Sequence, residues 1–465
     1  MEHSYIEAFL GSVLLSFILT RSVRNFAIAR GWVDSPTPDR HFHCKPVPRL
    51  GGVAIFLSFT ILVGVSLAAP KLLNLSAPFS VRTTLAILGP ALIVFLMGVY
   101  DDLRSLGPYW KFGIQSFAAV LLYFGGIGIH RLDLLSAGQA LHITIGLPLT
   151  ILWVLLITNA FNFIDGLDGL AAGSALFSTV VVFTVSLVMQ NHLVAFLTIV
   201  LAGGILGFLR YNFNPATIFL GDSGSQFIGF MLSALALAGS QKAPTMVAVA
   251  IPVVSLGLPI LDVVLAVIRR FLSGKPLFKG DDEHIHHKLL KRGFSQREAV
   301  LTLYAVTAGL ALLSLALLHG AETIALVLAV IGIGVLLGVQ YLRYAEFREL
   351  QDIVHRAIQR RRIMINNLLL RRATESLNSC ADLDMICRIL RDTLQPLGFD
   401  GFYFRNSSVD RVPDSFLTSL RPDPSGGLRC CWAHLEMTPV QAAIKEHEPA
   451  EEHRASKATS ASTLR

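Results

Sequence analysis

The sequence is poor in charged residues for its length. Asp, Glu, Lys and Arg make up 15% of the 465 residues, whereas hydrophobic residues make up 53%. A soluble globular protein usually has about 25% charged residues. The mean hydropathy is +0.59, and several apolar runs approach the roughly 20 residues that a transmembrane helix needs. This composition excludes an ordinary soluble enzyme and predicts an all-α polytopic membrane protein.

Disulfide bonds, a secretory leader and a nucleic-acid partner are not indicated either. The five cysteines form no CxxC pair and no even framework, which is typical of reduced thiols in the cytosol. Glu2 and Glu7 precede the first apolar run, and no small-residue cleavage site follows it. The net charge of +7 is explained by basic residues in short loops, so it requires no nucleic acid.

The apolar runs predict eleven transmembrane helices within a membrane domain of residues 1–342. The sixth and seventh runs are separated by almost nothing, and the ninth contains Pro252 and Pro259, which predict kinks. The expected helices cover residues 8–28, 51–69, 83–100, 112–130, 145–163, 173–190, 192–210, 224–240, 244–268, 298–318 and 322–342.

Basic residues follow the odd-numbered helices. Six of them lie between Arg21, near the end of the first helix, and Arg49, just before the second, and eight lie between the ninth and tenth. The even-numbered connections are nearly bare; their exceptions are Lys71, Arg82, Arg131 and Lys242. Because short cytoplasmic loops are enriched in Lys and Arg, we expect a multi-pass protein of the cell (inner) membrane. Its N-terminus is expected outside, and its C-terminus and the ends of the odd-numbered helices in the cytoplasm.

The polar clusters all fall on this predicted cytoplasmic face. They are Asp101, Asp102 and Lys111 after the third helix; Asn159, Asn162, Asp165 and Asp168 at the end of the fifth; Asn212 and Asp222 after the seventh; Asp281, Asp282, His284, His286 and His287 after the ninth; and Lys45 within DSPTPDRHFHCKPVPRLGG after the first. The opposite face has nothing comparable, so this face is the predicted site.

Each cluster taken alone also has a simpler interpretation. Adjacent acids often mark a solvated helix end, Asp residues cap helices or form turns, and Lys111 could be a membrane anchor. GDSGS does not have the G-x-S-x-G order of a nucleophile elbow. His-Ile-His-His could bind zinc, but no Cys or spaced His completes a tetrahedral set; phosphate binding suits it better.

Taken together, the clusters predict phosphoryl transfer. Carboxylate and amide oxygens from separate loops suit Mg²⁺, which shares its coordination sphere with substrate phosphates. Nearby Lys, Arg and His residues would neutralise the remaining charge as a nucleotide and a lipid phosphate react. A secondary transporter would place its ionisable residues near the bilayer midplane, and a membrane sensor would not need intact motifs; both remain alternatives.

Five motifs resemble one family in order and in loop position. They are PVPRLGG, the Asp101–Asp102 pair, NAFNFIDGLDGL, LGDSGS and DDEHIHH. Over residues 20–320 the chain resembles the polyprenyl-phosphate N-acetylhexosamine-1-phosphate transferases, in particular the branch that makes undecaprenyl-diphospho-N-acetylglucosamine. The resemblance implies eleven helices and a divalent cofactor, Mg²⁺ or alternatively Mn²⁺. It also implies transfer of a sugar-1-phosphate from a UDP-N-acetylhexosamine to undecaprenyl phosphate, with release of UMP, to start a cell-surface polysaccharide. A homodimer is left open.

The resemblance also implies roles for individual residues. Asp222 and Asn162 would bind the metal; Asp101, Asp102 and Lys111 would be catalytic; Lys45, Asp165, Asp168, Asn212, His284, His286 and His287 would bind substrates. The lipid phosphate is expected to attack directly, although a two-step route through an aspartyl-phosphate is an alternative. The muramoyl-pentapeptide branch has consecutive histidines where this chain has His-Ile-His-His, which argues against the pentapeptide substrate.

The residues after 342 lie outside the resemblance. Residues 343–372 are predicted to form an Arg-rich amphipathic helix on anionic membrane lipid. Residues 373–440 are predicted to form a small cytoplasmic α+β module, and residues 441–465 have a disordered composition.

Overall fold

The computed structural model describes residues 2–34, 46–73, 79–130, 142–240, 246–272, 284–319, 322–342, 345–379 and 382–394. The chain divides into two compact units, Met1–Glu346 and Phe347–Arg465. The predicted fold class is confirmed, because the described part is almost entirely helical. Its one sheet pairs β1 (Val33–Asp34) with β2 (Val47–Pro48) in antiparallel fashion.

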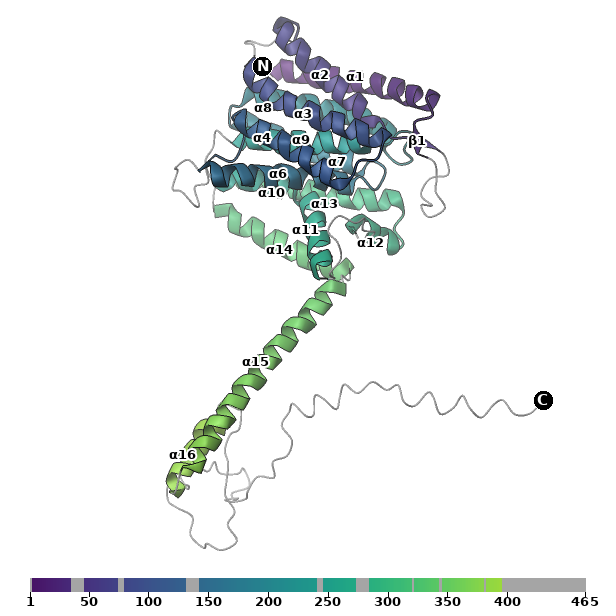
Figure 1. The fold of residues 1–465 in the computed structure, drawn as a ribbon. Coiled ribbons are helices and arrows are strands. Elements are labelled where there is room, and N and C mark those ends of the chain that lie inside the picture. The colour runs from purple at the N-terminus through teal and green to yellow at the C-terminus, as the bar shows by residue number, and fades with distance from the viewer. Residues whose placement is uncertain are drawn as a thin grey trace, which may run out of the picture. The chain divides into compact units, whose positions relative to one another are not determined.

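The first unit is a bundle of helices (Figure 1). They are α1 (Glu2–Ala29), α2 (Gly51–Ala68), α3 (Val81–Leu103), α4 (Pro108–Phe124), α6 (Ile143–Ile164), α7 (Leu170–Val188), α8 (His192–Asn212), α9 (Gly221–Ser240), α10 (Met246–Ser255), α11 (Gly257–Leu272), α12 (Ile285–Lys291), α13 (Gln296–Ala316) and α14 (Glu322–Leu342). Eight of the described helices are long and apolar enough to cross a membrane. The other three predicted spans coincide with α4, α9 and the pair α10–α11.

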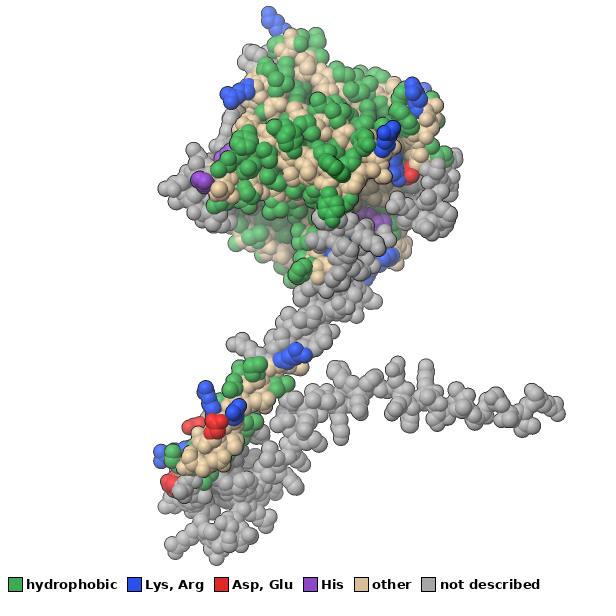
Figure 2. Space-filling view, viewed as in Figure 1, with side chains coloured by type: hydrophobic (Ala, Val, Ile, Leu, Met, Phe, Trp, Pro, Cys, Tyr) green, Lys and Arg blue, Asp and Glu red, His purple; other side chains and the backbone are tan. Residues whose placement is uncertain are grey.

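The surface of the first unit is apolar where a water-soluble protein would be charged. Figure 2 shows hydrophobic side chains over most of the visible face of the bundle. Large apolar side chains such as Leu14 and Leu312 are exposed by 61% and 70%. Because so much exposed apolar surface is rare on a soluble monomer, these side chains face lipid, and the chain is a multi-pass membrane protein.

Helix α9 lies at the centre of the bundle. Its residues from Ser223 to Gly239 are all buried, and it packs against α2, α3, α6 and α7. Two glycines of neighbouring helices touch the backbone at its start. A Cβ atom at Gly52 would lie 2.1 Å from the Gly224 nitrogen, and one at Gly98 would lie 2.6 Å from the Asp222 carbonyl oxygen. Only glycine permits this approach, which fixes the beginning of α9 against α2 and α3.

The ninth predicted span is two helices instead of one kinked helix. Leu256 separates α10 from α11. Pro259 has no N–H group to donate to the Ser255 carbonyl one turn earlier, and the hydroxyl of Ser178 donates to that carbonyl instead, at 3.2 Å. The chain therefore changes direction, and α11 runs across the longer helices (Figure 1).

Beyond residue 344 the structure describes two helices. α15 (Ala345–Asn378) covers most of the range of the predicted Arg-rich helix, and α16 (Leu383–Leu394) follows it. The rest of the expected α+β module and the C-terminal tail lie outside the described residues.

Candidate active site

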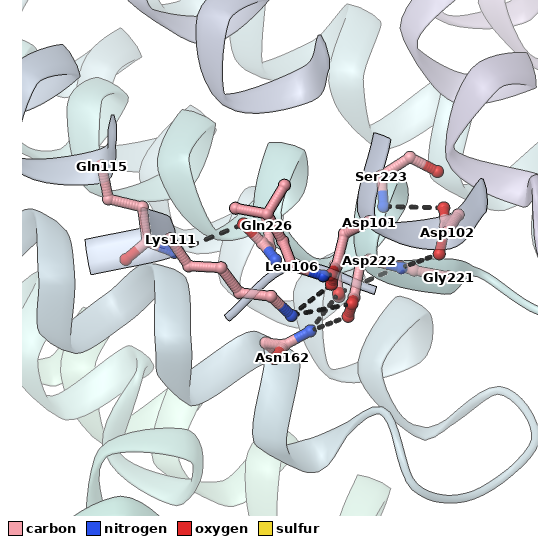
Figure 3. Close-up of polar contacts among 11 residues, drawn as sticks. Asp101, Asp102, Leu106, Lys111, Gln115, Asn162, Gly221, Asp222, Ser223 and Gln226 are labelled. Carbon is pink, nitrogen blue, oxygen red and sulfur yellow. Dashed lines mark hydrogen bonds and ion pairs between the residues drawn. The ribbon is translucent and has the colours of Figure 1, made fainter. Parts of the chain in front are cut away.

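Asp222 is the centre of a cluster built from four helices (Figure 3). It is the second residue of α9, and its carboxylate accepts hydrogen bonds from Lys111 Nζ of α4 at 3.1 Å and from Asn162 Nδ2 of α6 at 2.5 Å. Lys111 also forms an ion pair with Asp101 near the end of α3. The structure thus brings together four of the predicted site residues, which stand up to 121 positions apart in the chain.

The cluster holds more negative than positive groups. Asp101 and Asp222 share one lysine, Lys111, and the Asp101 side chain is only 4% exposed. Asp165 adds a further carboxyl group that interacts electrostatically with Asp222. Burial raises the pKa of Asp165 well above its usual range, and the negative charges of Asp222 and Asp102 raise it further. This excess of carboxyl groups favours either a bound cation or a retained proton.

The donor set fits a divalent cation that takes few protein ligands. Within the described ranges, no three His, Cys, Asp or Glu side chains form a group that could hold a metal alone. Mg²⁺ usually binds one or two carboxylates and keeps its other positions for water and phosphate oxygens. Asp222 and the amide oxygen of Asn162 could supply such oxygens, so the donor set fits the divalent cofactor that the resemblance implies.

Asp102 is placed differently from its neighbour Asp101. Its Oδ1 accepts from the backbone N–H of Asp222 at 2.7 Å, and its Oδ2 accepts from that of Ser223 at 3.0 Å. The carboxylate therefore caps the N-terminus of α9, where N–H groups lack partners within the helix. Gly221 leaves room for it: its φ is +76°, and a Cβ there would lie 2.7 Å from Asp102 Oδ2. In the structure Asp102 holds Asp222 in place, and its catalytic role stays a prediction.

The PVPRLGG motif supports the same loop through its backbone. Phe219 N donates to the Pro48 carbonyl at 2.8 Å, Gly51 N donates to the Phe219 carbonyl at 3.0 Å, and Gly52 N donates to the Leu220 carbonyl at 2.9 Å. The motif thus guides the chain into α9 just before Asp222. Lys45, also predicted to bind substrate, lies outside the described residues.

Asp168 and Asn212 hold the loop between α8 and α9. Asp168 Oδ2 accepts from Asn214 Nδ2 and from Ala216 N, both at 3.0 Å. Asn212 Nδ2 donates to the Ile218 carbonyl, also at 3.0 Å. Both side chains are buried. These hydrogen bonds tie both residues to the loop, and their substrate-binding roles stay predictions.

The histidines pack against the end of α6, next to the acidic cluster. The Phe163 and His284 rings stack with centroids 5.4 Å apart, and the His286 ring lies 5.7 Å from that of His284. His287 follows at 4.3 Å from His286. A Cβ at Gly166 would lie 2.4 Å from His286 Nε2, so only glycine lets this ring approach the loop after Asn162.

His286 is neutral at physiological pH. Burial lowers its pKa to about 3, and the neighbouring His287 lowers it as well. Its Nε2 atom is buried and has no hydrogen-bond partner among the described residues. A neutral ring can donate or accept a hydrogen bond, so His286 could bind a phosphate oxygen but would add no positive charge.

Asp262 lies beside the site but belongs to none of the five sequence motifs. It lies in α11, is 1% exposed, and its Oδ2 is 2.9 Å from His284 Nδ1. Its Oδ1 accepts from the backbone N–H of Ile285 at 2.8 Å. The sequence contains one indication of this contact: Asp262 is a lone carboxylate inside an apolar run, and a buried charge needs partners.

These features define an integral-membrane enzyme with its site at one end of a helix bundle. The family model described as "Glycosyl transferase family 4" matches residues 84–240, from α3 through α9. The chain belongs to this family, in the branch of the polyprenyl-phosphate N-acetylglucosamine-1-phosphate transferases. The resemblance drawn from the five motifs is confirmed.

Three relatives illustrate the similarity. The chain is 38% identical over 302 residues to a probable undecaprenyl-phosphate N-acetylglucosaminyl 1-phosphate transferase of Bacillus subtilis, spanning 65% of this chain and 81% of the relative. It is 36% identical over 331 residues to a decaprenyl-phosphate N-acetylglucosaminephosphotransferase of Mycobacterium tuberculosis, spanning 63% and 78%. It is 32% identical over 316 residues to a phospho-N-acetylmuramoyl-pentapeptide-transferase of Desulforudis audaxviator, spanning 62% and 89%.

Proposed function

We propose that this enzyme transfers N-acetylglucosamine-1-phosphate from UDP-N-acetylglucosamine to undecaprenyl phosphate and releases UMP. The product would start a cell-surface polysaccharide. The observation that carries the proposal is the convergence of Asp101, Lys111 and Asn162 on Asp222 at the ends of membrane-length helices. The two most similar relatives described above carry names with this activity on a polyprenyl phosphate.

The lipid phosphate is the nucleophile in this proposal. Its second pKa is about 6, so it is largely dianionic at neutral pH and needs no strong base. One of its oxygens forms a bond to the phosphorus that carries the sugar, while the bond from that phosphorus to the bridging oxygen breaks and UMP leaves. Lys111 lowers the repulsion between the two anions, and neutral His286 could hydrogen-bond a phosphate oxygen.

We propose Mg²⁺ as the cofactor, with Mn²⁺ as the alternative, held by Asp222 and Asn162. When bound, the ion supplies additional charge neutralisation at the pyrophosphate. Both oxygens of Asp102 already accept backbone hydrogen bonds, and Asp101 is paired with Lys111. Neither carboxylate is therefore arranged as a free nucleophile, which favours direct displacement over an aspartyl-phosphate route.

We place the site and the C-terminus on the cytoplasmic side of the cell (inner) membrane. The Lys and Arg residues that follow the odd-numbered spans support this orientation. Impermeant thiol labelling of single-Cys variants in intact cells tests it, and labelling at residue 297 would contradict it. A homodimer stays a prediction, to be tested by mass measurement in detergent.

One assay tests the reaction and its main alternative. Purified enzyme is supplied with undecaprenyl phosphate, a divalent salt and either UDP-N-acetylglucosamine or UDP-muramoyl-pentapeptide, and UMP release is measured. We expect turnover with the first donor. Turnover with the pentapeptide donor alone would place the chain with its 32% identical relative. Transport of substrate into vesicles without UMP release would instead favour the transporter.

A further inference from the structure

A chain of three amide side chains lies inside the bundle beside the active-site cluster. Asn159 Nδ2 of α6 donates to Gln115 Oε1 of α4 at 2.8 Å, and Gln115 Nε2 donates to Gln226 Oε1 of α9 at 3.3 Å. Gln115 and Gln226 are 0% and 1% exposed. Figure 3 shows both glutamines next to the cluster. We call these three residues the amide layer.

Each member of the amide layer lies about one helical turn from a cluster residue on the same helix. Gln115 follows Lys111 by four positions, and Gln226 follows Asp222 by four. Asn159 precedes Asn162 by three positions, and α6 reaches the site with its C-terminal end. Residues three or four apart share a helix face, so α4, α6 and α9 meet in two adjacent polar layers.

The amide layer restricts how these helices can slide past one another. Apolar side chains pack acceptably over a range of relative heights, whereas hydrogen bonds weaken steeply when donor and acceptor move apart. A buried amide that loses its partner cannot exchange it for water. The two interhelical bonds can therefore both be made only near one relative height of the three helices.

We propose that Gln115, Asn159 and Gln226 are positioning residues that set the relative heights of Lys111, Asn162 and Asp222. The inference rests on the proposed function, because it assigns these amides to the precision of that reaction. A displacement of about 1 Å of a reacting group can lower a rate about 100-fold. The alternative is that the amides only hold the bundle together.

Near-isosteric apolar substitutions separate the two roles. The Gln115→Met variant leaves the Gln226 carbonyl oxygen without its interhelical donor. The triple variant Gln115→Met, Asn159→Leu, Gln226→Met removes all three amides together and leaves no amide of the layer unpaired. Replacing both partners of a buried hydrogen bond by apolar groups of similar shape can be nearly neutral for stability.

Trp153→Phe is the matched control. It removes a different bond between α6 and α9, from Trp153 Nε1 to the Ser233 carbonyl at 3.2 Å, and leaves the cluster untouched. We expect Gln115→Met to lower both the Tm and kcat. We expect the triple variant to recover the Tm to within a few degrees of wild type while kcat stays at least tenfold low and the donor KM changes less than threefold. The control should keep kcat within about twofold.

A second measurement does not depend on turnover. Lys111 is held between Asp101 and Asp222, so its amine should react slowly with acetic anhydride. Mass spectrometry at low conversion compares its acetylation with that of exposed Lys71. We expect acetylation of Lys111 to be about fivefold faster in the triple variant and unchanged in the control. A wild-type enzyme that releases no UMP would contradict the proposed function, while this comparison would still test the layer.

Recovery of kcat together with Tm in the triple variant, or an unchanged Lys111 acetylation rate, would overturn the positioning role. Failure of both apolar variants to fold would overturn it as well, because the amides would then be needed for the bundle itself.

Discussion

The acidic cluster (Asp101, Lys111, Asn162, Asp165 and Asp222) and the histidine segment (His284 with helix α12) are supported in different ways. Asp222 is held by side chains from α3, α4 and α6, and the backbone at the start of α9 is held by Asp102 and by two glycine contacts. His284 and the start of the seven-residue helix α12 are tied to the buried carboxylate of Asp262, and the His284 ring stacks on Phe163. Many supports from long helices indicate a fixed geometry. A short helix whose start is tied to one buried carboxylate should be easier to displace when that carboxylate is removed.

The largest expected effect is the loss of the centre of the acidic cluster. Asp222→Ala removes the carboxylate that Lys111 and Asn162 share. We expect kcat to fall on the order of 10³-fold, the scale seen when a main electrostatic group of a site is removed. UMP release over a range of Mg²⁺ concentrations measures it. Asp392→Ala on α16 is the control, and full turnover of Asp222→Ala at low Mg²⁺ would refute the ligand assignment.

Asp102→Ala tests how much the cap at the start of α9 contributes to stability and to activity. The variant leaves the N–H groups of Asp222 and Ser223 without their acceptor. We expect a loss of about 1–2 kcal/mol in stability and a fall in activity of roughly 10–100-fold. Thermal unfolding in detergent and UMP release measure the two effects. If activity falls while the Tm is unchanged, Asp102 acts on substrate and not through α9.

Asp262→Ala tests the carboxylate that holds the start of the histidine segment. His284 loses the partner of its Nδ1 atom, and Ile285 N loses its acceptor. We expect about a tenfold fall in turnover, typical of removing a residue that orients a site histidine. Asp262→Asn retains one acceptor oxygen and should recover part of the loss. Equal losses in both variants would show that the negative charge matters more than orientation.

Asp165→Asn tests the electrostatic strain of the acidic cluster. The folded-state pKa of Asp165 is raised, so the folded protein retains this proton more tightly than the unfolded chain, and wild-type stability falls as pH rises from about 4. Asparagine removes this dependence. In EDTA we expect a Tm gain of a few degrees at neutral pH that disappears below about pH 4. A lower Tm at pH 7 would contradict the assignment.

The smallest expected effect concerns the second unit. Truncation after Asn378, the end of α15, removes no residue of either the acidic cluster or the histidine segment. We expect turnover per folded molecule within about twofold of full length, in detergent and in anionic liposomes. A loss of more than about tenfold, equivalent to about 1.4 kcal/mol of barrier, would show that the tail belongs to the working enzyme.

Hydropathy and motif order predicted much of the bundle. The apolar runs located the helices. The polar residues at the helix ends indicated a shared site, and Asp101, Lys111, Asn162 and Asp222 do meet in the structure. These predictions succeed because a membrane helix has a definite length and charged residues collect where it ends.

Other features of the site depend on contacts between distant segments, which no local sequence pattern indicates. Asp101 and Asp102 are adjacent and chemically identical in sequence, yet one pairs with Lys111 and the other caps α9. Asp262 and Gln115 lie in largely apolar runs, so only the packing of another helix against them reveals their partners.

The central position of α9 has a consequence for biosynthesis. α9 is not among the described helices that are apolar enough to cross a membrane by composition, and it carries buried polar residues such as Ser223 and Gln226. Its main neighbours, α3 and α6, precede it in the chain. As synthesis proceeds, α9 thus emerges after the helices that shield its polar groups, and its retention in the bilayer depends on docking against them more than on its own affinity for lipid.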